Sequence, residues 1–498
     1  MVLEHLEPKL VWAIFENVFT KTPRCSKKEE RIRRVLKDFL SHEAGIRNIE
    51  LSIKEDSAGN ILVKKSATAG MDSKPSILLQ GHLDMVCETD RKDGFNFDTD
   101  PIPVQIQDNG EWVDADETTL GADNGIGMSL AFALLLDPEV AHGPIEVLAT
   151  VDEETGLTGA FALDPAQMGI ESKMLINIDS EDLGVITIGS AGGGDTVFSK
   201  SLTKVPSPSD FKFFTLSVDG FLGGHSGVDI HLPRGNANKV AARLLSSLLD
   251  EMPILIAEWN GGGKRNAIPR SSSVTFGIHS DNLNKAHEIL SAEKNDIESY
   301  YLGGEMPIEP DLTINWSKST ASHSFNSEES SKIIRTFHIL PHGALKFSPA
   351  VAGLVETSNN VAVITTTEEG IRLQMSTRSN LDSELEVKRR EIRYIGESYG
   401  WEVEQGPAYP GWAPDPTSKF LKFIKEKYEQ MLGSTVKVEA IHAGLECGIL
   451  GAGIPGLKMV SIGPSLKNPH SPDEKLKIAD VGILYNLLKE IIRDLPTF

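Results

Sequence analysis

Four short apolar runs constrain the fold of this chain more than any other feature of its 498 residues. They are residues 77–80 (ILLQ), 145–151 (IEVLATV), 174–178 (MLINI) and 457–462 (LKMVSI). Their length and β-branched content, with turn residues nearby, predict buried strands. Residues 126–136 (IGMSLAFALLL), between the first two runs, are rich in helix-forming residues. This alternation predicts an α/β domain with a mainly parallel sheet.

Imidazole and carboxylate side chains collect where the predicted strands end. The residues that follow the strands, or in one case precede the predicted helix, are His82, Asp84, Asp123, Asp152, Glu153, Glu154, Asp179 and His470. Open parallel sheets bind ligands at the carboxyl ends of their strands. Charged groups delivered there by apolar strands are costly unless they are paired or bound to a metal. We therefore interpret this set as a metal centre.

Each of these patterns, taken alone, has an ordinary structural explanation. A single His-x-Asp pair is usually a surface or capping pair, and three consecutive acidic residues are usually solvated charge. Asp123 by itself could cap the helix that follows it. The histidines outside the set, His442 among them, are expected in loops or at the surface. It is the convergence of five separate segments on one sheet edge that favours the metal centre.

The spacing of these residues suggests their roles. Side chains two apart on an extended segment face the same way, so Asp84 is placed to accept the second N–H of the His82 imidazole. Neighbouring side chains face opposite ways, so of Glu153 and Glu154 one can bind metal while the other reaches toward the attacking water. Asp152 stands beside them, and the sequence leaves open a register in which it takes one of these roles.

The remaining side chains of the set form a consistent group of metal ligands. They are His82, Asp123, Glu154, Asp179 and His470. Two four-coordinate metals that share one bridging carboxylate and one water would use these five ligands well. Oxygen and nitrogen donors without a thiolate suit zinc, with cobalt or manganese as substitutes. The expected cofactors are therefore two divalent ions, with zinc as the preferred metal.

Residues 191–405 differ in pattern from the segments before and after them. They open at a glycine cluster and contain loop-like tracts such as NGGGKRNAIP. Two similar units can be distinguished, each with a helix pattern, an asparagine-led extended pair and a second helix pattern. Their segments are residues 236–250, 266–280 and 285–300, and residues 328–337, 360–379 and 385–399. We predict an inserted α+β lid domain, duplicated, in a catalytic domain made of residues 1–190 and 406–498.

Charge and cysteine content narrow the expected partners and compartment. The formal charge of −22 argues against nucleic acid or an anionic membrane as a partner, because both require a basic surface. The first residues, MVLEHLEPKL, carry acids where a signal peptide would carry lysines. Only three cysteines occur, Cys25, Cys87 and Cys447. We expect no disulfide framework, a cytoplasmic protein in a reducing compartment, and a packing role for Cys87.

The motifs GHLDMV, GADNGIG, DEETG, INIDSED, GGHSG and NPHSP closely resemble those of a known enzyme family. It is the dinuclear-zinc family of aminoacylases, glutamate-releasing carboxypeptidases and dipeptidases, and the similarity spans residues 81–474. The resemblance implies that His82, Asp123 and Asp179 hold one metal. It implies that Asp123 also bridges to a second metal held by Glu154 and His470. Asp84 would orient His82, and Glu153 would be the general base.

Residues of the predicted lid and of one further loop are candidates for contacts with the substrate. His225, in GGHSG, is expected to donate to the tetrahedral oxyanion, because its flanking glycines allow close approach. Arg378, in IRLQMSTRS, is the best match to a family arginine that holds the substrate's C-terminal carboxylate. A structural or surface role is the alternative for both. Further contacts are expected from Asn266 and Asn360, and Glu446, in IHAGLECG, is placed to sense the substrate amine.

The resemblance implies a metal-dependent dipeptidase of broad specificity that includes Xaa-His substrates of the β-Ala-His type. A metal-held water would attack the peptide bond while Glu153 accepts its proton. An N-acyl amino-acid deacylase or a carboxypeptidase with the same core is the alternative. A non-catalytic metal-binding or scaffold protein is a third, which the presence of Glu153 argues against. A homodimer through the lid and a doubled lid that mimics a dimer within one chain both stay open.

Overall fold

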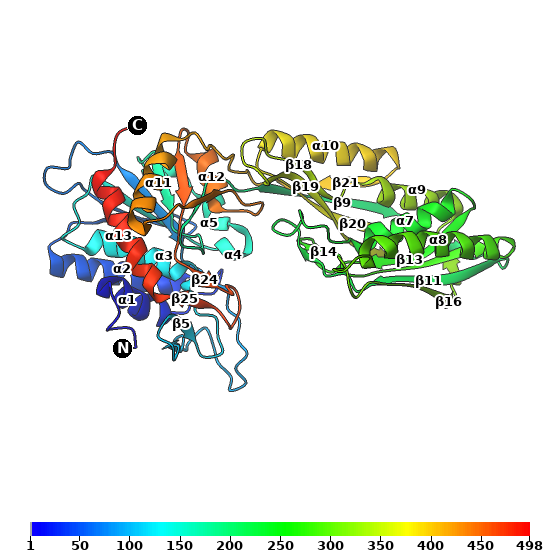
Figure 1. Ribbon diagram of the computed structural model, residues 1–498, viewed down its shortest axis with the longest axis horizontal. Helices are drawn as coiled ribbons and strands as arrows, with labels where there is room; N and C mark the ends of the chain where they lie inside the picture. Colours follow the sequence, from blue (N-terminus) through cyan, green and yellow to red (C-terminus); the bar gives the residue numbers. More distant parts are fainter. Residues whose placement is uncertain (1) are drawn as a thin grey trace. The chain divides into compact units, whose positions relative to one another are not determined.

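The computed structural model describes residues 2–498, which divide into two units (Figure 1). Unit 1 comprises the described chain up to Gly189 together with Pro414–Ala440 and Leu445–Phe498. Unit 2 comprises Ser190–Ala413 and the short segment Ile441–Gly444. The chain thus leaves unit 1, forms unit 2, and returns to complete unit 1.

Unit 1 contains an eight-stranded sheet in the order β1-β2-β6-β3-β7-β23-β8-β22. The strands are β1 (Ser52–Glu55), β2 (Ile61–Lys65), β3 (Ile77–His82), β6 (Ile145–Thr150), β7 (Met174–Asn177), β8 (Val185–Thr187), β22 (Lys437–Glu439) and β23 (Lys458–Ser461). The four central strands, β6, β3, β7 and β23, are those predicted from the apolar runs, and they are parallel to one another. β1, β2 and β6 are joined by antiparallel pairings, and β8 is antiparallel to β23. The predicted α/β class is confirmed, with a parallel centre and mixed edges.

Helices pack against this sheet, and three of its central strands, β3, β6 and β7, are buried along their whole length, whereas β23 is buried in its second half. α3 (Ala122–Leu136) packs on β3 and β6, and every residue of it except Asp123 is buried, which accounts for its apolar sequence. α13 (Ile478–Asp494) contacts both α3 and α11 (Lys419–Leu432). The N-terminal helices are α1 (Lys9–Ile14), which continues as a π-helix to Thr20, and α2 (Glu30–Arg47). Between residues 2 and 498, no helix has the length and apolar character to cross a membrane.

A small four-stranded sheet, β24-β25-β5-β4, completes unit 1. Its strands are β4 (Val104–Ile106), β5 (Trp112–Ala115), β24 (Leu466–Lys467) and β25 (Lys475–Lys477). β24 and β25 pair antiparallel and form a hairpin, and β25 is anchored on β5. The loop of this hairpin carries His470, so paired strands flank that residue on both sides.

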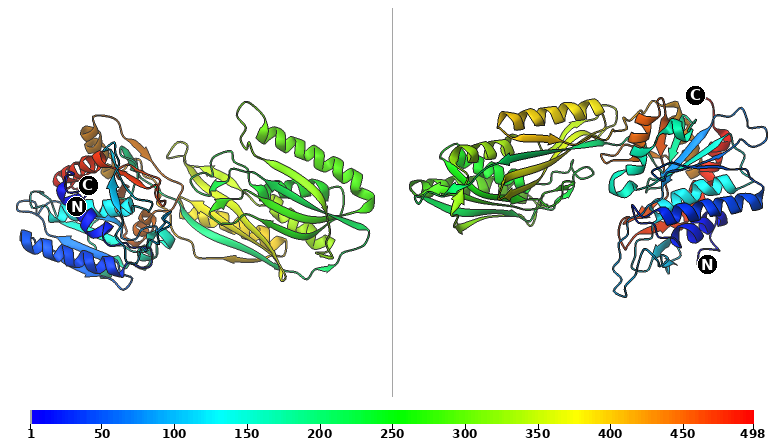
Figure 2. Two further views of the ribbon diagram at one scale, coloured as in Figure 1. Left: turned by 90° about the horizontal axis from the view of Figure 1, so that it is seen from below. Right: turned by 180° about the vertical axis from the view of Figure 1, so that it is seen from behind.

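Unit 2 is built on a nine-stranded antiparallel sheet, with helices along one of its faces (Figures 1 and 2). The strand order is β16-β11-β15-β13-β19-β20-β9-β21, with β18 paired to β19. The strands are β9 (Gly192–Ser201), β11 (Phe211–Asp219), β13 (Ile254–Gly261), β15 (Ser272–His279), β16 (Thr313–Ser319), β18 (Gly343–Phe347), β19 (Val355–Thr367), β20 (Gly370–Ser379) and β21 (Glu402–Gln405). The two-residue strands β12 (Gly224–His225) and β14 (Ala267–Ile268) pair with each other beside it.

The helices of unit 2 occupy the segments in which the sequence predicts helices. They are α7 (Ala237–Leu249), α8 (Leu283–Leu302), α9 (Ser327–Ile339) and α10 (Asp382–Ser398). α7, α9 and α10 each contact strands of the sheet, and their buried faces join the strands in one apolar core. The extended pairs fall on β14 with β15 and on β19 with β20. An internal duplication of this unit stays a prediction.

Candidate metal centre

His82 lies at the end of β3 and is the hub of a cluster of ionisable side chains in unit 1. Its side chain is only 1% exposed. Its Nδ1 lies 3.3 Å from Oδ1 of Asp84, as the spacing of the two residues predicts. Its Nε2 lies 3.0 Å from Oδ1 of Asp123 and 3.4 Å from Oδ1 of Asp179. Although burial lowers the pKa of His82, the carboxylates of Asp179 and Asp123 outweigh it and raise that pKa well above its ordinary value.

Asp123 connects His82 to the other half of the cluster. While its Oδ1 faces His82, its Oδ2 lies 3.0 Å from Nε2 of His470. The same nitrogen of His470 lies 3.0 Å from Oε2 of Glu154. Hydrogen bonds with Asp123 and Glu154 raise the pKa of His470 to about 11. The structure therefore brings His82, Asp123, Glu154, Asp179 and His470 together, with the Asp123 carboxylate at their centre.

Asp84 is fully buried and links His82 to the acidic segment after β6. Its Oδ1 accepts the backbone N–H of Glu153 at 3.0 Å, and its Oδ2 accepts that of Glu154 at 3.2 Å. The hydroxyl of Ser26 donates to Oδ2 at 2.7 Å. Burial would raise the pKa of Asp84, but the hydrogen bond and charge of His82 lower it to about 2. Asp84 is thus held by groups that all donate to its ionised form.

Glu153 and Glu154 begin a helical turn, α4 (Glu153–Gly156). The sequence predicts that their side chains face opposite ways on an extended segment, so the predicted backbone conformation is wrong here. Glu154 nevertheless faces the cluster, whereas no hydrogen bond or ion pair within residues 2–498 involves the Glu153 carboxylate. Burial raises the pKa of Glu153 well above its ordinary value, and the charge of His82 opposes the rise. Asp152 accepts hydroxyl hydrogen bonds from Thr155 and Thr158, both at 2.5 Å, so its carboxylate holds this turn together.

The chemistry of the cluster fits a divalent metal. Ligand atoms of His82, Asp123 and Glu154 all lie within 4.8 Å of one another, close enough to hold a metal ion or two neighbouring ions bridged by Asp123. Oε1 of Glu154 is buried and has no hydrogen-bond partner among the described residues. The donors are oxygen and imidazole nitrogen, the set that zinc accepts in catalytic sites. Burial, with the nearby charges of Asp123 and Glu154, raises the pKa of Asp179 to about 6.

Glu446 is buried at the start of α12 (Glu446–Gly453), also in unit 1. Its Oε2 accepts hydrogen bonds from Nε2 of Gln80 and from the hydroxyl of Thr150, both at 2.6 Å. Its Oε1 is buried without a partner in the described chain. Burial raises the pKa of Glu446 to about 7. Gln80 and Thr150 belong to β3 and β6, and neither has a sequence signal beyond its place in a strand.

His225 belongs to β12 in unit 2, and its ring is oriented by backbone groups. Its Nδ1 accepts the N–H groups of Gly227 at 3.2 Å and Val228 at 3.0 Å. Burial, and then the positive charge of Arg378, lowers the pKa of His225. A neutral ring whose Nδ1 accepts two hydrogen bonds carries its proton on Nε2. His225 and Asn266 both line a cavity of about 550 Å³ in this unit.

Arg378 lies on β20 and is 9% exposed. Its Nη1 donates to the Tyr409 hydroxyl at 2.9 Å, and its buried Nε has no partner within residues 2–498. Asn360, which is fully buried on β19, donates through Nδ2 to the carbonyl oxygens of Arg265 and Ala267. The amide donors of Asn360 therefore hold the end of the loop before β14 and the first residue of β14.

His442 is buried in unit 2, and its expected place in a loop or at the surface is half right. It lies on the connecting segment Ile441–Gly444, but it is only 6% exposed and shares a 2.7 Å hydrogen bond with the hydroxyl of Ser358. Burial, assisted by the charge of Arg378, lowers the pKa of His442 to about 3. The sequence around it, IHAGLECG, contains no apolar periodicity that would have signalled burial.

The buried His442 is expected to make the stability of unit 2 fall as the solution is acidified. Its pKa is about 3 in the folded state and 6.5 without burial, so between these values the unfolded chain binds the extra proton. Its contribution is therefore complete above pH 6.5 and is lost toward pH 3. Replacing His442 by Gln should reduce the slope of unfolding free energy against pH in that range by about 1.4 kcal/mol per unit. Chemical denaturation at several pH values measures the slope, and equal slopes in both proteins would contradict the prediction.

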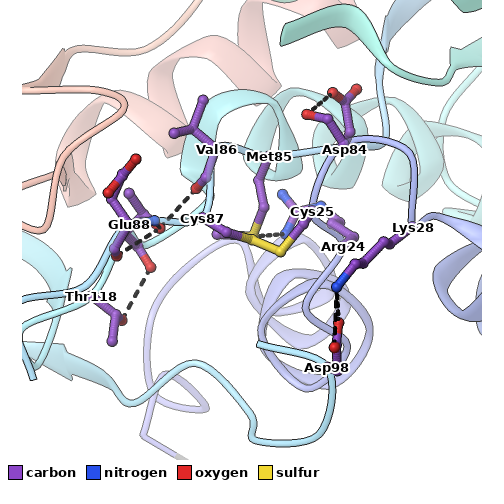
Figure 3. Close-up of a disulfide and its surroundings, with 12 residues drawn as sticks. Arg24, Cys25, Lys28, Asp84, Met85, Val86, Cys87, Glu88, Asp98 and Thr118 are labelled. Atoms are coloured by element: carbon purple, nitrogen blue, oxygen red, sulfur yellow. Dashed lines mark hydrogen bonds and ion pairs between the residues drawn. A yellow bond between two sulfur atoms is a disulfide. The ribbon is translucent and has the colours of Figure 1, made fainter. Parts of the chain in front are cut away.

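Cys25 and Cys87 form a disulfide beside the cluster (Figure 3), which corrects the expectation that the cysteines are unpaired. Their Cα atoms are 5.6 Å apart because the backbone pairs Cys25 with Met85 in a parallel bridge. Cys25 precedes Ser26, the residue that donates to Asp84. Cys447 is free and buried. An odd cysteine count conceals such a pair, because the pairing depends on a contact between segments 62 residues apart.

Reducing this disulfide is expected to destabilise unit 1. Closing a loop of 62 residues should contribute about 4 kcal/mol on the chain-entropy account. A dithiol reductant should therefore lower the thermal midpoint of the wild-type protein. It should leave the midpoint of a Cys25→Ser, Cys87→Ser double variant unchanged. A wild-type midpoint that is insensitive to the reductant would contradict the prediction.

Comparison with known proteins places the chain in a family. A family model described as peptidase family M20/M25/M40 matches residues 78–494. The cytosol non-specific dipeptidase of Escherichia coli (strain K12) is 36% identical over 494 residues, which cover 99% of both chains. The structure of aminoacylhistidine dipeptidase from Vibrio alginolyticus matches with a TM-score of 0.91 at 36% identity, over 100% of this chain and 99% of that one. The aminopeptidase PepT from Bacillus cereus shares the fold, with a TM-score of 0.54 at 15% identity over 98% and 99% of the two chains. The chain belongs to peptidase family M20/M25/M40.

Proposed function

We propose that this peptidase hydrolyses dipeptides with broad specificity, including Xaa-His substrates of the β-Ala-His type. The observation that carries the proposal is the convergence of five imidazole and carboxylate side chains around Asp123. Its support for a dipeptidase is the 36% identity to relatives named cytosol non-specific dipeptidase and aminoacylhistidine dipeptidase. Both relatives are matched over nearly their whole length, so the comparison includes both units.

Two divalent ions, with zinc as the preferred metal and cobalt or manganese as substitutes, are the proposed cofactors. His82, Asp123 and Asp179 would hold one ion, and Asp123, Glu154 and His470 the other. The arrangement of Asp123 supports this division, because its two oxygens face different histidines at 3.0 Å. A bound ion of this kind lowers the pKa of a water molecule and polarises the carbonyl group under attack. Asp84 would fix the tautomer of His82 through Nδ1.

Glu153 is the proposed general base. Its carboxylate would accept a proton from the attacking water and pass it to the nitrogen of the departing amine. Two observations support this role. The Glu153 carboxylate has no hydrogen bond or ion pair among the described residues, and Asp84 holds the backbone N–H of Glu153 at 3.0 Å. The base is thus fixed through its main chain while its side chain stays available.

His225 is the proposed donor to the tetrahedral oxyanion. A donor for this purpose must present a proton from a fixed position. The tautomer of His225 meets that condition, because the backbone N–H groups of Gly227 and Val228 occupy Nδ1 and leave the proton on Nε2. His225, on its glycine-flanked turn, is therefore suited to donate a hydrogen bond to the oxyanion that forms when water attacks the peptide bond.

Four residues are proposed to contact the dipeptide, and a different observation supports each of them. Arg378 would hold the C-terminal carboxylate, and the unpartnered Nε of its buried guanidinium favours this role. Glu446 would bind the substrate amine, since its buried Oε1 lacks a partner in the described chain. Asn266 would contribute from the cavity that it shares with His225. Asn360 would contribute through Oδ1 only, because its amide donors are already used.

The domain roles, compartment and assembly complete the proposal. Residues 191–405 would act as a lid with two similar halves, and residues 1–190 and 406–498 as the catalytic domain. The E. coli relative is named as a cytosol protein, which supports a cytoplasmic location for this chain. The disulfide removes the support that the cysteine count lent to that location. The acidic charge of −22 supports small peptides rather than nucleic acid or membranes as partners, and a homodimer through the lid stays an expectation.

A panel of substrates on metal-stripped and refilled protein tests this function. The protein is treated with a chelator, refilled with zinc, cobalt or manganese, and assayed on Ala-His, β-Ala-His, other dipeptides and an N-acetyl amino acid. Hydrolysis of several dipeptides only after refilling is expected. Cleavage of the N-acetyl substrate in preference to all dipeptides would instead identify a deacylase. Absence of any metal-dependent cleavage would refute the enzymatic proposal.

A further inference from the structure

Glu474 lies directly before β25 and is almost fully buried, at 2% exposure. Its carboxylate accepts backbone N–H groups from four consecutive residues. Oε2 accepts those of Leu120 and Gly121, both at 2.8 Å, and Oε1 accepts those of Ala122 at 2.8 Å and Asp123 at 3.1 Å. A carboxylate has about four lone-pair positions, so the turn of residues 120–123 uses all of them. A contact of this completeness fixes the path of the backbone that ends at Asp123.

The other side of this turn is held as closely. Nη2 of the fully buried Arg24 donates to the carbonyl oxygen of Gly121 at 2.5 Å. Gly121 has a φ of 69°, and a Cβ atom there would lie 2.8 Å from Sδ of Met85. The side chain of Asn124 donates to the carbonyl oxygen of Ile178 at 2.5 Å, next to Asp179. These contacts hold the turn of residues 120–123 in one conformation. Glu474 accepts more of the turn's hydrogen bonds than any other side chain named here.

Glu474 also belongs to the same loop as His470. The hairpin formed by β24 and β25 carries both residues, and β25 is anchored on β5. Through Glu474 the hairpin binds the N–H of Asp123, and through Nε2 of His470 it lies 3.0 Å from the Asp123 carboxylate. One loop thus contacts the backbone and the side chain of the same aspartate.

We propose that Glu474 is a positioning residue that holds the Asp123 carboxylate between His82 and His470. The proposal rests on the proposed function, in which Asp123 bridges two metal ions. Glu474 lies behind the bridging residue and acts only through the backbone of residues 120–123. A ligand that must face two partners at once tolerates little displacement, and supporting groups of this kind commonly determine metal affinity.

Substitution of Glu474 separates positioning from general stability. In Glu474→Gln the amide nitrogen would face two backbone N–H groups, so half of the contacts become repulsive. Glu474→Asp retains an acceptor carboxylate that is one methylene too short to reach all four N–H groups. Glu146→Gln is a matched control, because Glu146 is a buried glutamate of the same unit that accepts the N–H groups of Glu171 and Ser172.

The measurement is the affinity of chelator-treated protein for Co²⁺, followed by its visible spectrum and by competition with a chelating dye. We expect Glu474→Gln to bind Co²⁺ roughly 10- to 100-fold more weakly than the wild type, and Glu474→Asp to be intermediate. Glu146→Gln should match the wild type. In the metal-free proteins, the amides of residues 120–123 should exchange with solvent faster in both Glu474 variants than in the control.

Wild-type Co²⁺ affinity and wild-type amide exchange in Glu474→Gln would overturn the proposal. An equal loss of affinity in Glu146→Gln would also overturn it, because any buried carboxylate would then have the same effect. If Glu474→Gln does not fold, the comparison of Glu474→Asp with Glu146→Gln decides the question by the same readouts. Failure of the wild-type protein to bind Co²⁺ would refute the proposed metal centre itself, a result distinct from a failure confined to Glu474.

Discussion

Replacing Glu153 by Gln should lower kcat for dipeptide hydrolysis by about a hundredfold to ten-thousandfold while leaving the bound metal in place. Glutamine has the size of glutamate, but its amide cannot accept a proton from the attacking water at neutral pH. The Glu153 side chain makes no hydrogen bond or ion pair with the rest of the described chain, so little structure depends on its charge. The measurement is kcat at saturating dipeptide together with metal content per chain.

The neighbouring residue provides the matched control. Oε2 of Glu154 lies 3.0 Å from His470 inside the cluster, so Glu154→Gln should lose metal as well as activity. The Glu153→Gln variant would then retain metal without turnover, whereas the Glu154→Gln variant would lose both metal and turnover. A Glu153→Gln variant with a near-normal kcat, or with metal loss equal to that of Glu154→Gln, would exclude Glu153 as the general base.

The central strands and the cluster could be predicted from the sequence for a common physical reason. Parallel strands covered by helices are mainly apolar, so β3, β6, β7 and the segment that contains β23 stand out in the sequence as short, mainly apolar runs. Because parallel strands end at one edge, the polar residues that follow them must converge, and His82 and Asp179 lie 3.4 Å apart as a result. The outer strands of the sheet, β1 and β2 on one side and β8 and β22 on the other, were missed, since short or half-buried strands have no such signature.

The parts of the site that the sequence did not reveal depend on contacts between distant segments. Glu474 reaches the turn of residues 120–123, at the start of α3, across more than 350 positions of the chain, and only the folded hairpin brings them together. The Cys25–Cys87 disulfide depends on a β-bridge that no periodicity announces. The turn at Glu153 was misjudged because four residues are too few to show a helical pattern. Local patterns therefore predict which residues meet, but not what holds them in register.

Replacing Arg378 by Ala should raise the KM for dipeptides by roughly a hundredfold, with metal content unchanged. A charged, two-pronged hydrogen bond to a carboxylate contributes about 3 kcal/mol, and each 1.4 kcal/mol is worth a factor of ten. Arg378 belongs to unit 2, whereas the five clustered side chains belong to unit 1. Arg372, an exposed arginine of the same strand, is the matched control, and its alanine variant should keep the wild-type KM.

A second substrate identifies the group that Arg378 recognises. If the guanidinium binds the C-terminal carboxylate, a dipeptide amide should be a poor substrate of the wild-type protein, since it lacks the charge. Removal of Arg378 should then raise the KM for the amide only slightly. The preference for the acid over the amide should therefore largely disappear in the variant. Tyr409→Phe should reduce this preference in part, because the tyrosine hydroxyl is the acceptor that orients Nη1 at 2.9 Å. Equal losses for acid and amide would mean that Arg378 supports the fold of unit 2 and not the substrate, and an unchanged KM would remove it from the site.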